Sequence, residues 1–375
     1  MFKKSCLSIL VSVTLLSACG SDNDDDNTSF DFDATPMITN LTEDVIVAGY
    51  VDLNTKAEAF VAAITTLSTD KTEANLAAAQ QAWKDVRQPW EQGESHIFGP
   101  VDSLSIDPHL DSWPLNTSDL EDLLSSQDSF TADGVRNSND DVQGFHTMEF
   151  LLFGDGVEDN TKAITEMTDL EIEYLSATAE VFNGYTQDLE DAWLVASDAN
   201  NDSSEAYKDY LLETDNEIYS SQVGVIEELI NGLIGIVDEV GNGKIADPFG
   251  ADIDSTDTSL VESQYSWNSL ADFTDNITGV QNVYRGEFDG EADAAGIIDF
   301  VAAADSELAT RVDEEIATAI ANIQAIAGTD DLPFRQAIND ADARVRIQTA
   351  IDSLSVLQTS LENDVLLLLN EWNVQ

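Results

Sequence analysis

The residues best suited to chemistry in this chain are His146 and Glu149, which lie three positions apart in the sequence Gly144-Phe145-His146-Thr147-Met148-Glu149. The surrounding residues predict a helix, so the two side chains share one helix face with Cβ atoms roughly 5–6 Å apart. An imidazole nitrogen and a carboxylate oxygen at this spacing can bind one metal ion or act as an acid–base pair. The chain contains only three histidines, so few other nitrogen ligands exist.

The pair taken alone is a weak signal. A zinc-protease helix carries two histidines four positions apart with a glutamate between them, or the inverted arrangement. Position 150 here is Phe, no second histidine lies nearby, and we treat His96 and His109 as incidental. A single histidine on a helix is more often a structural residue than a ligand.

Two other segments concentrate polar and aromatic side chains. The first places Trp83, Arg87, Trp90 and Glu94 at intervals of four, three and four, which aligns them on one helix face. The alternative is a packed amphipathic face with an Arg–Glu pair. The second segment runs from Glu262 to Ser269 and on to Asp272 and Phe273. Its alternative is a solvated helix start capped by serines.

The elements that must position these residues are helices. Apolar residues recur every three or four positions along most of the chain, and alternating strand patterns bounded by hairpin turns are absent. The predicted helices are Lys56 to Leu67, Lys71 to Ile97, Asp159 to Val195 (one or two helices), Glu205 to Val240, Val301 to Ala327, Pro333 to Leu354 and Val356 to Trp372. Gly241-Asn242-Gly243 is expected to stop the fourth of these helices. We predict an all-α fold of two antiparallel helical-bundle domains with a cleft between them.

The balance of charged residues limits the kinds of partner that the protein can bind. The chain has 15 Lys+Arg against 73 Asp+Glu, a formal net charge of −58. Nucleic acids and anionic lipid surfaces require basic patches, so neither is expected as a partner. The acids are spread along the whole chain, which favours an acid-rich surface suited to salty surroundings over one cation-concentrating field.

The first residues predict export. Lys3 and Lys4 precede an apolar core from Leu7 to Leu16, which is too short to span a bilayer. The ending Leu16-Ser17-Ala18-Cys19 resembles a bacterial lipobox, which implies cleavage before Cys19 and a membrane anchor through its lipidated form. Gly20 after the cysteine suggests the outer membrane. The predicted organisation is a signal peptide (1–18), an acidic disordered linker (19–36) and helical bundles over 37–243 and 244–375. The bundles contain no cysteine, so thiolate chemistry is excluded.

Several blocks together resemble the imelysin family of bacterial envelope proteins. The blocks are Trp83 to Pro100, Asp111-Ser112-Trp113-Pro114-Leu115, Gly144 to Gly154, Lys244-Ile245-Ala246-Asp247-Pro248 and Glu262 to Phe273. The resemblance covers the chain from about residue 40 onward. It implies two helical bundles whose shared cleft gathers these residues, envelope residence as a lipoprotein, and a link to iron uptake.

The resemblance assigns the metal site to His146 and Glu149, and we add Glu94 and Glu262 as ligand candidates from neighbouring blocks. The rest of the cleft, which would bind a ligand or orient the metal ligands, is assigned to Arg87, Ser263, Ser266, Asn268 and Asp272. An oxygen-rich site with one imidazole suits iron or another relatively hard divalent or trivalent cation, with zinc as the second choice. The expected partners are a metal or metal complex and outer-membrane iron-uptake components.

Two other functions stay open. The family was named for a protease, so a metallopeptidase using His146 as ligand and Glu149 as ligand or base is one. A metal-free adaptor that binds a peptide, haem or a partner lipoprotein in the cleft is the other.

Overall fold

The computed structural model describes residues 29–198, 204–288 and 295–373. Its elements are almost all helices, which confirms the predicted all-α class. The helices in the first part are α1 (Thr35–Asn40), α2 (Ala48–Thr69), α3 (Glu73–Gly93), α4 (Pro100–Ser103), α5 (Ile106–Leu110), α6 (Thr117–Ser126), α7 (Ala132–Arg136), α8 (Gly144–Phe153), α9 (Asp169–Leu194) and α10 (Tyr207–Leu212). Those that follow are α11 (Gln222–Asp238), α12 (Asp247–Phe249), α13 (Ser269–Arg285), α14 (Ile297–Ala304), α15 (Ser306–Ala325), α16 (Phe334–Ala337) and α17 (Ala341–Ser360).

Shorter helical segments and two strands complete the description. The π-helical segments are Leu41–Val47, Glu239–Ala246 and Leu361–Val365. The 3₁₀ segments are Glu94–His96, Asp140–Val142, Ile164–Glu166, Ile253–Ser255, Thr258–Leu260, Gly328–Asp330 and Leu366–Asn370. The strands β1 (Phe30–Asp31) and β2 (Trp372–Asn373) pair in parallel, which ties the first described residues to the last.

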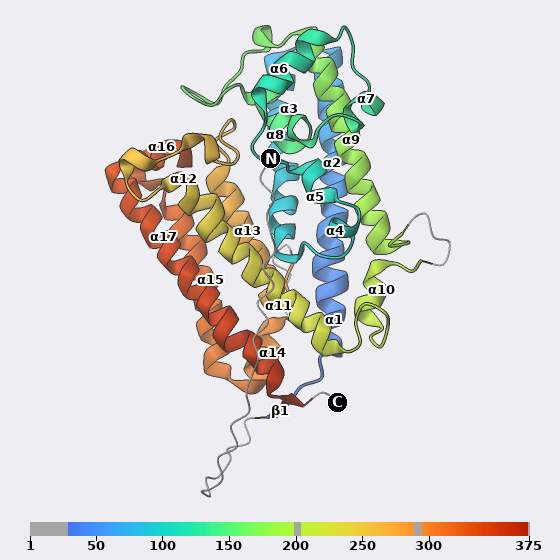
Figure 1. Cartoon of the computed structure of the whole chain (residues 1–375), viewed down its shortest axis with the longest axis vertical. Helices are drawn as coiled ribbons and strands as arrows, with labels where there is room; N and C mark the ends of the chain where they lie inside the picture. The colour runs from blue at the N-terminus through green and yellow to red at the C-terminus, as the bar shows by residue number, and fades with distance from the viewer. Residues whose placement is uncertain (1–28, 199–203, 289–294, 374–375) are drawn as a thin grey trace, which may run out of the picture.

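The helices form two groups. In the N-terminal group, α2 packs against α3 and α9, and α8 packs against α3 and α9 (Figure 1). In the C-terminal group, α15 packs against α13 and α17, and α11 also contacts both of those helices. The helix α11 therefore packs with the C-terminal group although it precedes the expected boundary near residue 245. The division into domains at 243/244 stays a prediction.

Helix α13 joins the two groups because it packs against α3 as well as α15. The backbones approach closely at Gly279, where a Cβ atom would lie 2.1 Å from the carbonyl oxygen of Gln92. Any larger side chain would push α13 away from the end of α3. The contact brings Arg87 and Glu91 of α3 within reach of polar side chains on α13.

Four expectations about the chain are corrected. The predicted signal peptide, Cys19 and the linker up to residue 28 lie outside the described residues, but residues 29–36 of that linker are ordered. Phe30 packs on Phe300 with ring centroids 5.4 Å apart, and Ala34 is fully buried. The helix predicted over Glu205 to Val240 is two helices, α10 and α11. The helix predicted from Asp159 begins at α9, where the Thr168 side chain and Glu171 form a capping box.

The fourth correction concerns Gly241-Asn242-Gly243, which does not stop a helix. The chain continues from α11 through a π-helical segment over Glu239–Ala246 and into α12. Gly241 is buried against Leu354 of α17, so tertiary packing holds this segment helical despite its glycines. No described helix is both long enough and apolar enough to cross a membrane.

Candidate metal centre

The centre is built on a buried arginine. Arg87 of α3 has no exposed surface and places its guanidinium over the ring of Phe145, 4.8 Å from the centroid. Its nitrogens contact four carboxylates from four segments of the chain: Glu91, Asp111, Glu262 and Asp272. Such a guanidinium fixes the carboxylates around it because each contact is a charge-assisted hydrogen bond or ion pair in a dry interior. These carboxylates keep the pKa of Arg87 above its ordinary value despite burial.

His146 lies beside this cluster with its two ring nitrogens in different surroundings. Nδ1 is 3.0 Å from Glu149 Oε2. The other oxygen of Glu149 accepts hydrogen bonds from the Tyr265 amide (3.0 Å) and from the Ser266 amide and hydroxyl (2.7 Å each). Glu149 is thereby locked in place and holds the Nδ1 side of the ring. This arrangement leaves Nε2 as the nitrogen available to a ligand.

The available nitrogen points at two carboxylates. Nε2 is 3.0 Å from Asp111 Oδ1 and 4.0 Å from Glu262 Oε1, and it makes no hydrogen bond of good geometry. One ligand atom from each of these three residues lies within 4.8 Å of the other two. His146 is 1% exposed, so this grouping is buried. Two carboxylates and one imidazole with a fixed outer hydrogen bond are a donor set that iron and other relatively hard cations accept.

The charges around His146 explain its protonation in the metal-free chain. Burial disfavours the imidazolium, but the interactions with Asp111 and Glu149 outweigh burial and raise the pKa of His146 to about 9. Burial likewise disfavours ionised Asp111, but Arg87 and His146 hold its pKa well below the usual value. A metal ion at Nε2 would take the place of a proton.

Local structure brings Asp111 to this point. It directly follows α5, and its Oδ2 accepts a hydrogen bond of 2.6 Å from Trp90 Nε1. The end of α5 packs against the start of α8, where Gly144 adopts φ +75°. A Cβ atom on Gly144 would lie 2.4 Å from the Leu110 carbonyl oxygen, so only glycine permits this approach.

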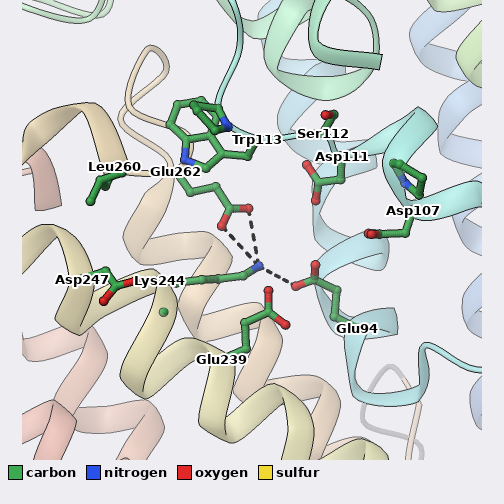
Figure 2. Close-up of a pocket in the computed structure, with 13 residues that line it drawn as sticks. Glu94, Asp107, Asp111, Ser112, Trp113, Glu239, Lys244, Asp247, Leu260 and Glu262 are labelled. Carbon is green, nitrogen blue, oxygen red and sulfur yellow. Dashed lines mark hydrogen bonds and ion pairs between the residues drawn. The ribbon is translucent and has the colours of Figure 1, made fainter. Parts of the chain in front are cut away.

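A second buried cation, Lys244, lies among carboxylates next to the Arg87 cluster. The Lys244 ammonium, carried by the π-helical segment, lies 2.6 Å from Glu94 and 3.4 Å from Glu262 (Figure 2). It also lies 3.3 Å from Glu91. Asn276 of α13 donates to Glu91 and to Glu94, each at 2.6 Å. Burial, only partly offset by Lys244, raises the pKa of Glu94 to about 7.

The predicted site residues converge, with different roles. The structure groups Glu262 with His146, places Glu149 behind the imidazole, and groups Glu94 with Lys244. Ser266 holds Glu149, and Asn268 donates to Asp272 at 2.6 Å, which in turn faces Arg87. Ser263 is buried with a hydroxyl that has no partner among the described residues. Metal ligation by Glu149 and Glu94 stays a prediction.

One sequence alternative is wrong. The segment from Glu262 to Asn268 is no solvated helix start, because it is a buried turn before α13 with positive φ at Ser263 and Trp267. The turn directs the backbone amides of Tyr265 and Ser266 at Glu149.

Sequence reasoning missed four residues as site members: Glu91, Asp111, Lys244 and Asn276. Glu91 had a signal, since it lies four positions after Arg87 on the same helix. Asp111 and Lys244 lie within the blocks quoted for the resemblance but were not singled out. Nothing local marks Asn276, which reaches the site through α13.

The grouped residues open onto a cleft of about 530 Å³. Among its lining residues, Asp111 and Glu262 reach the centre, and Trp113 lies over it with its ring centroid 4.5 Å from that of His146. Figure 2 shows acidic side chains arranged around Lys244 in this cleft.

Known proteins resemble this chain in sequence and in architecture. The chain is 30% identical over 360 residues to iron-regulated protein A of Synechococcus elongatus, covering 94% of this chain and 90% of that protein. A solved structure of a candidate iron-regulated protein A precursor from Parabacteroides distasonis superposes with a TM-score of 0.76 at 29% identity, over 94% of this chain and 97% of that one.

A more distant structure shares the fold alone. An imelysin-like protein of Psychrobacter arcticum has a TM-score of 0.66 at 14% identity, over 89% of this chain and 96% of that one. Residues 46–361 match the family model of imelysin, also described as peptidase M75. The chain belongs to the imelysin family.

Proposed function

We propose that this protein binds a metal ion through Asp111, His146 and Glu262 and serves iron acquisition. The observation that carries the proposal is the buried Nε2 of His146, which faces Asp111 at 3.0 Å and Glu262 at 4.0 Å without a good hydrogen bond. Iron is the preferred ion and zinc the second choice, because the set holds two oxygen donors and one nitrogen.

The charge of the centre supports a multivalent cation. Six acidic side chains lie within ion-pair distance of Arg87, Lys244 or His146: Glu91, Glu94, Asp111, Glu149, Glu262 and Asp272. Two fixed cations therefore leave an excess of up to four negative charges when His146 is neutral. A divalent or trivalent ion offsets part of this excess.

The remaining parts of the proposal come from the sequence and the relatives. Iron-regulated protein A is the name of the Synechococcus relative, which supports an iron-related role for this chain. The lipobox-like Leu16-Ser17-Ala18-Cys19 supports a lipid anchor in the bacterial envelope, on the outer membrane. Membrane attachment through Cys19 would place the metal centre near outer-membrane iron-uptake components.

Titration calorimetry with Fe²⁺, Fe³⁺ and Zn²⁺ tests metal binding on the protein that begins at residue 19. We expect His146→Ala to weaken the affinity at least roughly 100-fold, about 2.7 kcal/mol. His109→Ala is the matched control, because His109 stacks on Tyr185 and pairs with Asp140 away from the centre. Absence of binding, or equal affinities in both variants, would overturn the proposal.

We propose that Glu149 positions His146 and is not a general base. Both of its oxygens are engaged, one by His146 and one by Tyr265 and Ser266. The metallopeptidase alternative is tested by incubation with unfolded proteins, with and without chelator. Chelator-sensitive cleavage that is lost in Glu149→Gln would establish it in place of the positioning role.

A further inference from the structure

The cleft above the candidate metal centre is strongly acidic. Its negative charge bears on whether a metal ion can enter as a hydrated cation or in an anionic chelate. Six carboxylates line it, from Glu94, Asp107, Asp111, Glu239, Asp247 and Glu262, against the single ammonium of Lys244. A second cavity of about 460 Å³ adjoins it, since Glu94, Asp107 and Glu239 line both. The second cavity adds Asp102 and Glu228 and no basic residue.

Neither fixed cation of the site can hold an anionic molecule in the cleft. The Lys244 ammonium already contacts Glu91, Glu94 and Glu262 at 2.6–3.4 Å. Arg87 is completely buried behind the same carboxylates. An anion that entered would therefore meet carboxylates without a free positive partner, and repulsion in such a partly enclosed space is stronger than in water.

Three of the lining carboxylates are not used by the fold. Among the described residues, the side chains of Asp107, Glu239 and Asp247 make no hydrogen bond or ion pair, whereas Glu94, Asp111 and Glu262 are all paired. Figure 2 shows all three around the cleft that leads to Lys244 and Glu262. Free carboxylates that line the approach to the buried Nε2 of His146, which makes no well-aligned hydrogen bond among the described residues, attract cations and repel anions.

Volume does not make this selection. Six waters occupy about 180 Å³ at about 30 Å³ each, so a cleft of about 530 Å³ has room for a hydrated ion and also for a small chelate. Charge is the property that separates the two.

We propose that the protein takes its metal as a free hydrated cation through this cleft and rejects metal that is held in an anionic chelate. This inference rests on the proposed function and adds the class of substrate. The ion loses its waters to Asp111, His146 and Glu262, and any anionic chelator stays outside.

Association kinetics test the role of the free carboxylates. Co²⁺ is mixed rapidly with the protein, and quenching of Trp113, whose ring lies 4.5 Å from that of His146, reports arrival. The triple variant Asp107→Asn, Glu239→Gln, Asp247→Asn is expected to bind Co²⁺ about tenfold more slowly at low salt, with little difference at high salt. Trp113→Phe should remove the quenching signal.

The matched control removes three charges elsewhere. Glu58, Asp122 and Glu314 are exposed, and their side chains make no hydrogen bond or ion pair among the described residues. The variant Glu58→Gln, Asp122→Asn, Glu314→Gln should bind Co²⁺ less than about twofold more slowly than the parent protein, because these charges lie outside the cleft. Equal rates in the two triple variants would overturn the inference.

Equilibrium dialysis tests the chelate directly. Radiolabelled nitrilotriacetate forms an anionic complex with Co²⁺, and with Co²⁺ in excess over the chelator the protein is expected to retain the free cobalt without the label. Retention of chelator and cobalt in equal amounts would overturn this inference and leave metal binding intact. Failure of free Co²⁺ to bind would instead overturn the proposed function, so the two failures are distinguishable.

Discussion

Two buried groups of carboxylates lie side by side in this protein and differ in what completes them. Around Arg87, the carboxylates of Asp111 and Glu262 also face an imidazole nitrogen that makes no good hydrogen bond. Around Lys244, the carboxylates of Glu91 and Glu94 are closed by an ammonium and by Asn276. The same residue types thus give an open ligand set in one place and a filled one in the other. The difference is that the Lys244 ammonium fills the second group, whereas no lysine ammonium fills the first among the described residues.

The largest effect is expected from removing the shared anchor of the first group. Arg87→Met leaves four buried carboxylates without their guanidinium, and breaking a buried ion pair costs about 3–5 kcal/mol. Urea unfolding of the variant measures the loss. The control is Arg311→Met, because Arg311 is 47% exposed and its pairs with Glu315 and Asp364 are worth at most about 1 kcal/mol. Similar losses in both variants would contradict the role of Arg87.

Replacing Lys244 tests whether the second group is a filled cation site. Lys244→Gln should destabilise the protein by about 3 kcal/mol, because Glu91, Glu94 and Glu262 lose their positive partner. We expect added Mn²⁺ to restore part of this stability in the variant beyond any effect on the parent protein. Melting temperatures with and without the ion measure the difference. If Mn²⁺ raises the melting temperature of the variant no more than that of the parent protein, the position of the ammonium is not a site that a metal ion can occupy.

An intermediate effect is expected where the imidazole is oriented. Glu149→Gln keeps the side-chain shape but weakens the hold on His146 Nδ1, and loss of such an outer partner lowers metal affinity about 10–100-fold. Calorimetry measures the affinity, and circular dichroism should show an unchanged helix content. Ser266→Ala should give a smaller decrease, because the two backbone amides still hold Glu149. Unchanged affinity in Glu149→Gln would remove the distinction between the two groups.

The smallest effect concerns Asp275, a half-buried carboxylate outside both groups. Asp275 of α13 accepts from Gln92 at 2.9 Å, and burial raises its pKa to about 6. A carboxylate whose pKa is higher folded than unfolded loses stability as the pH rises from about 4 to 6. Asp275→Asn should therefore be more stable than the parent by about 1 kcal/mol at pH 7, with the gain absent below pH 4. Urea unfolding at both pH values measures it, and a gain at pH 4 as large as at pH 7 would contradict this account.

Much of this architecture was accessible from sequence because it depends on local patterns. Helical periodicity predicts the all-α class, and the three-residue spacing of His146 and Glu149 predicts their contact, which the structure places at 3.0 Å. Arg87 and Glu262 were singled out from polar residues in otherwise apolar or aromatic segments. Each of these signals lies within one segment of the chain.

The partners that come from distant segments were not predictable in the same way. Asp111 reaches His146 only because α5 ends against α8 at Gly144. Glu149 was expected to be a ligand, yet the buried turn at Tyr265 and Ser266 engages one of its oxygens. Asn276 depends on the close approach of α13 to α3 at Gly279. These contacts depend on tertiary packing, which neither spacing nor propensity encodes.

In the π-helical segment over Glu239–Ala246, the number of residues determines where the Lys244 side chain points. A π turn contains an extra residue relative to an α turn, and each residue of an α-helix advances the side-chain direction by about 100°. Deleting a residue between 239 and 243 would restore ordinary α pitch but turn Lys244 away from Glu91, Glu94 and Glu262. The composition of this stretch, with its two glycines, suggests that it should tolerate deletions. The number of its residues nevertheless fixes the direction of the Lys244 side chain below the candidate metal centre.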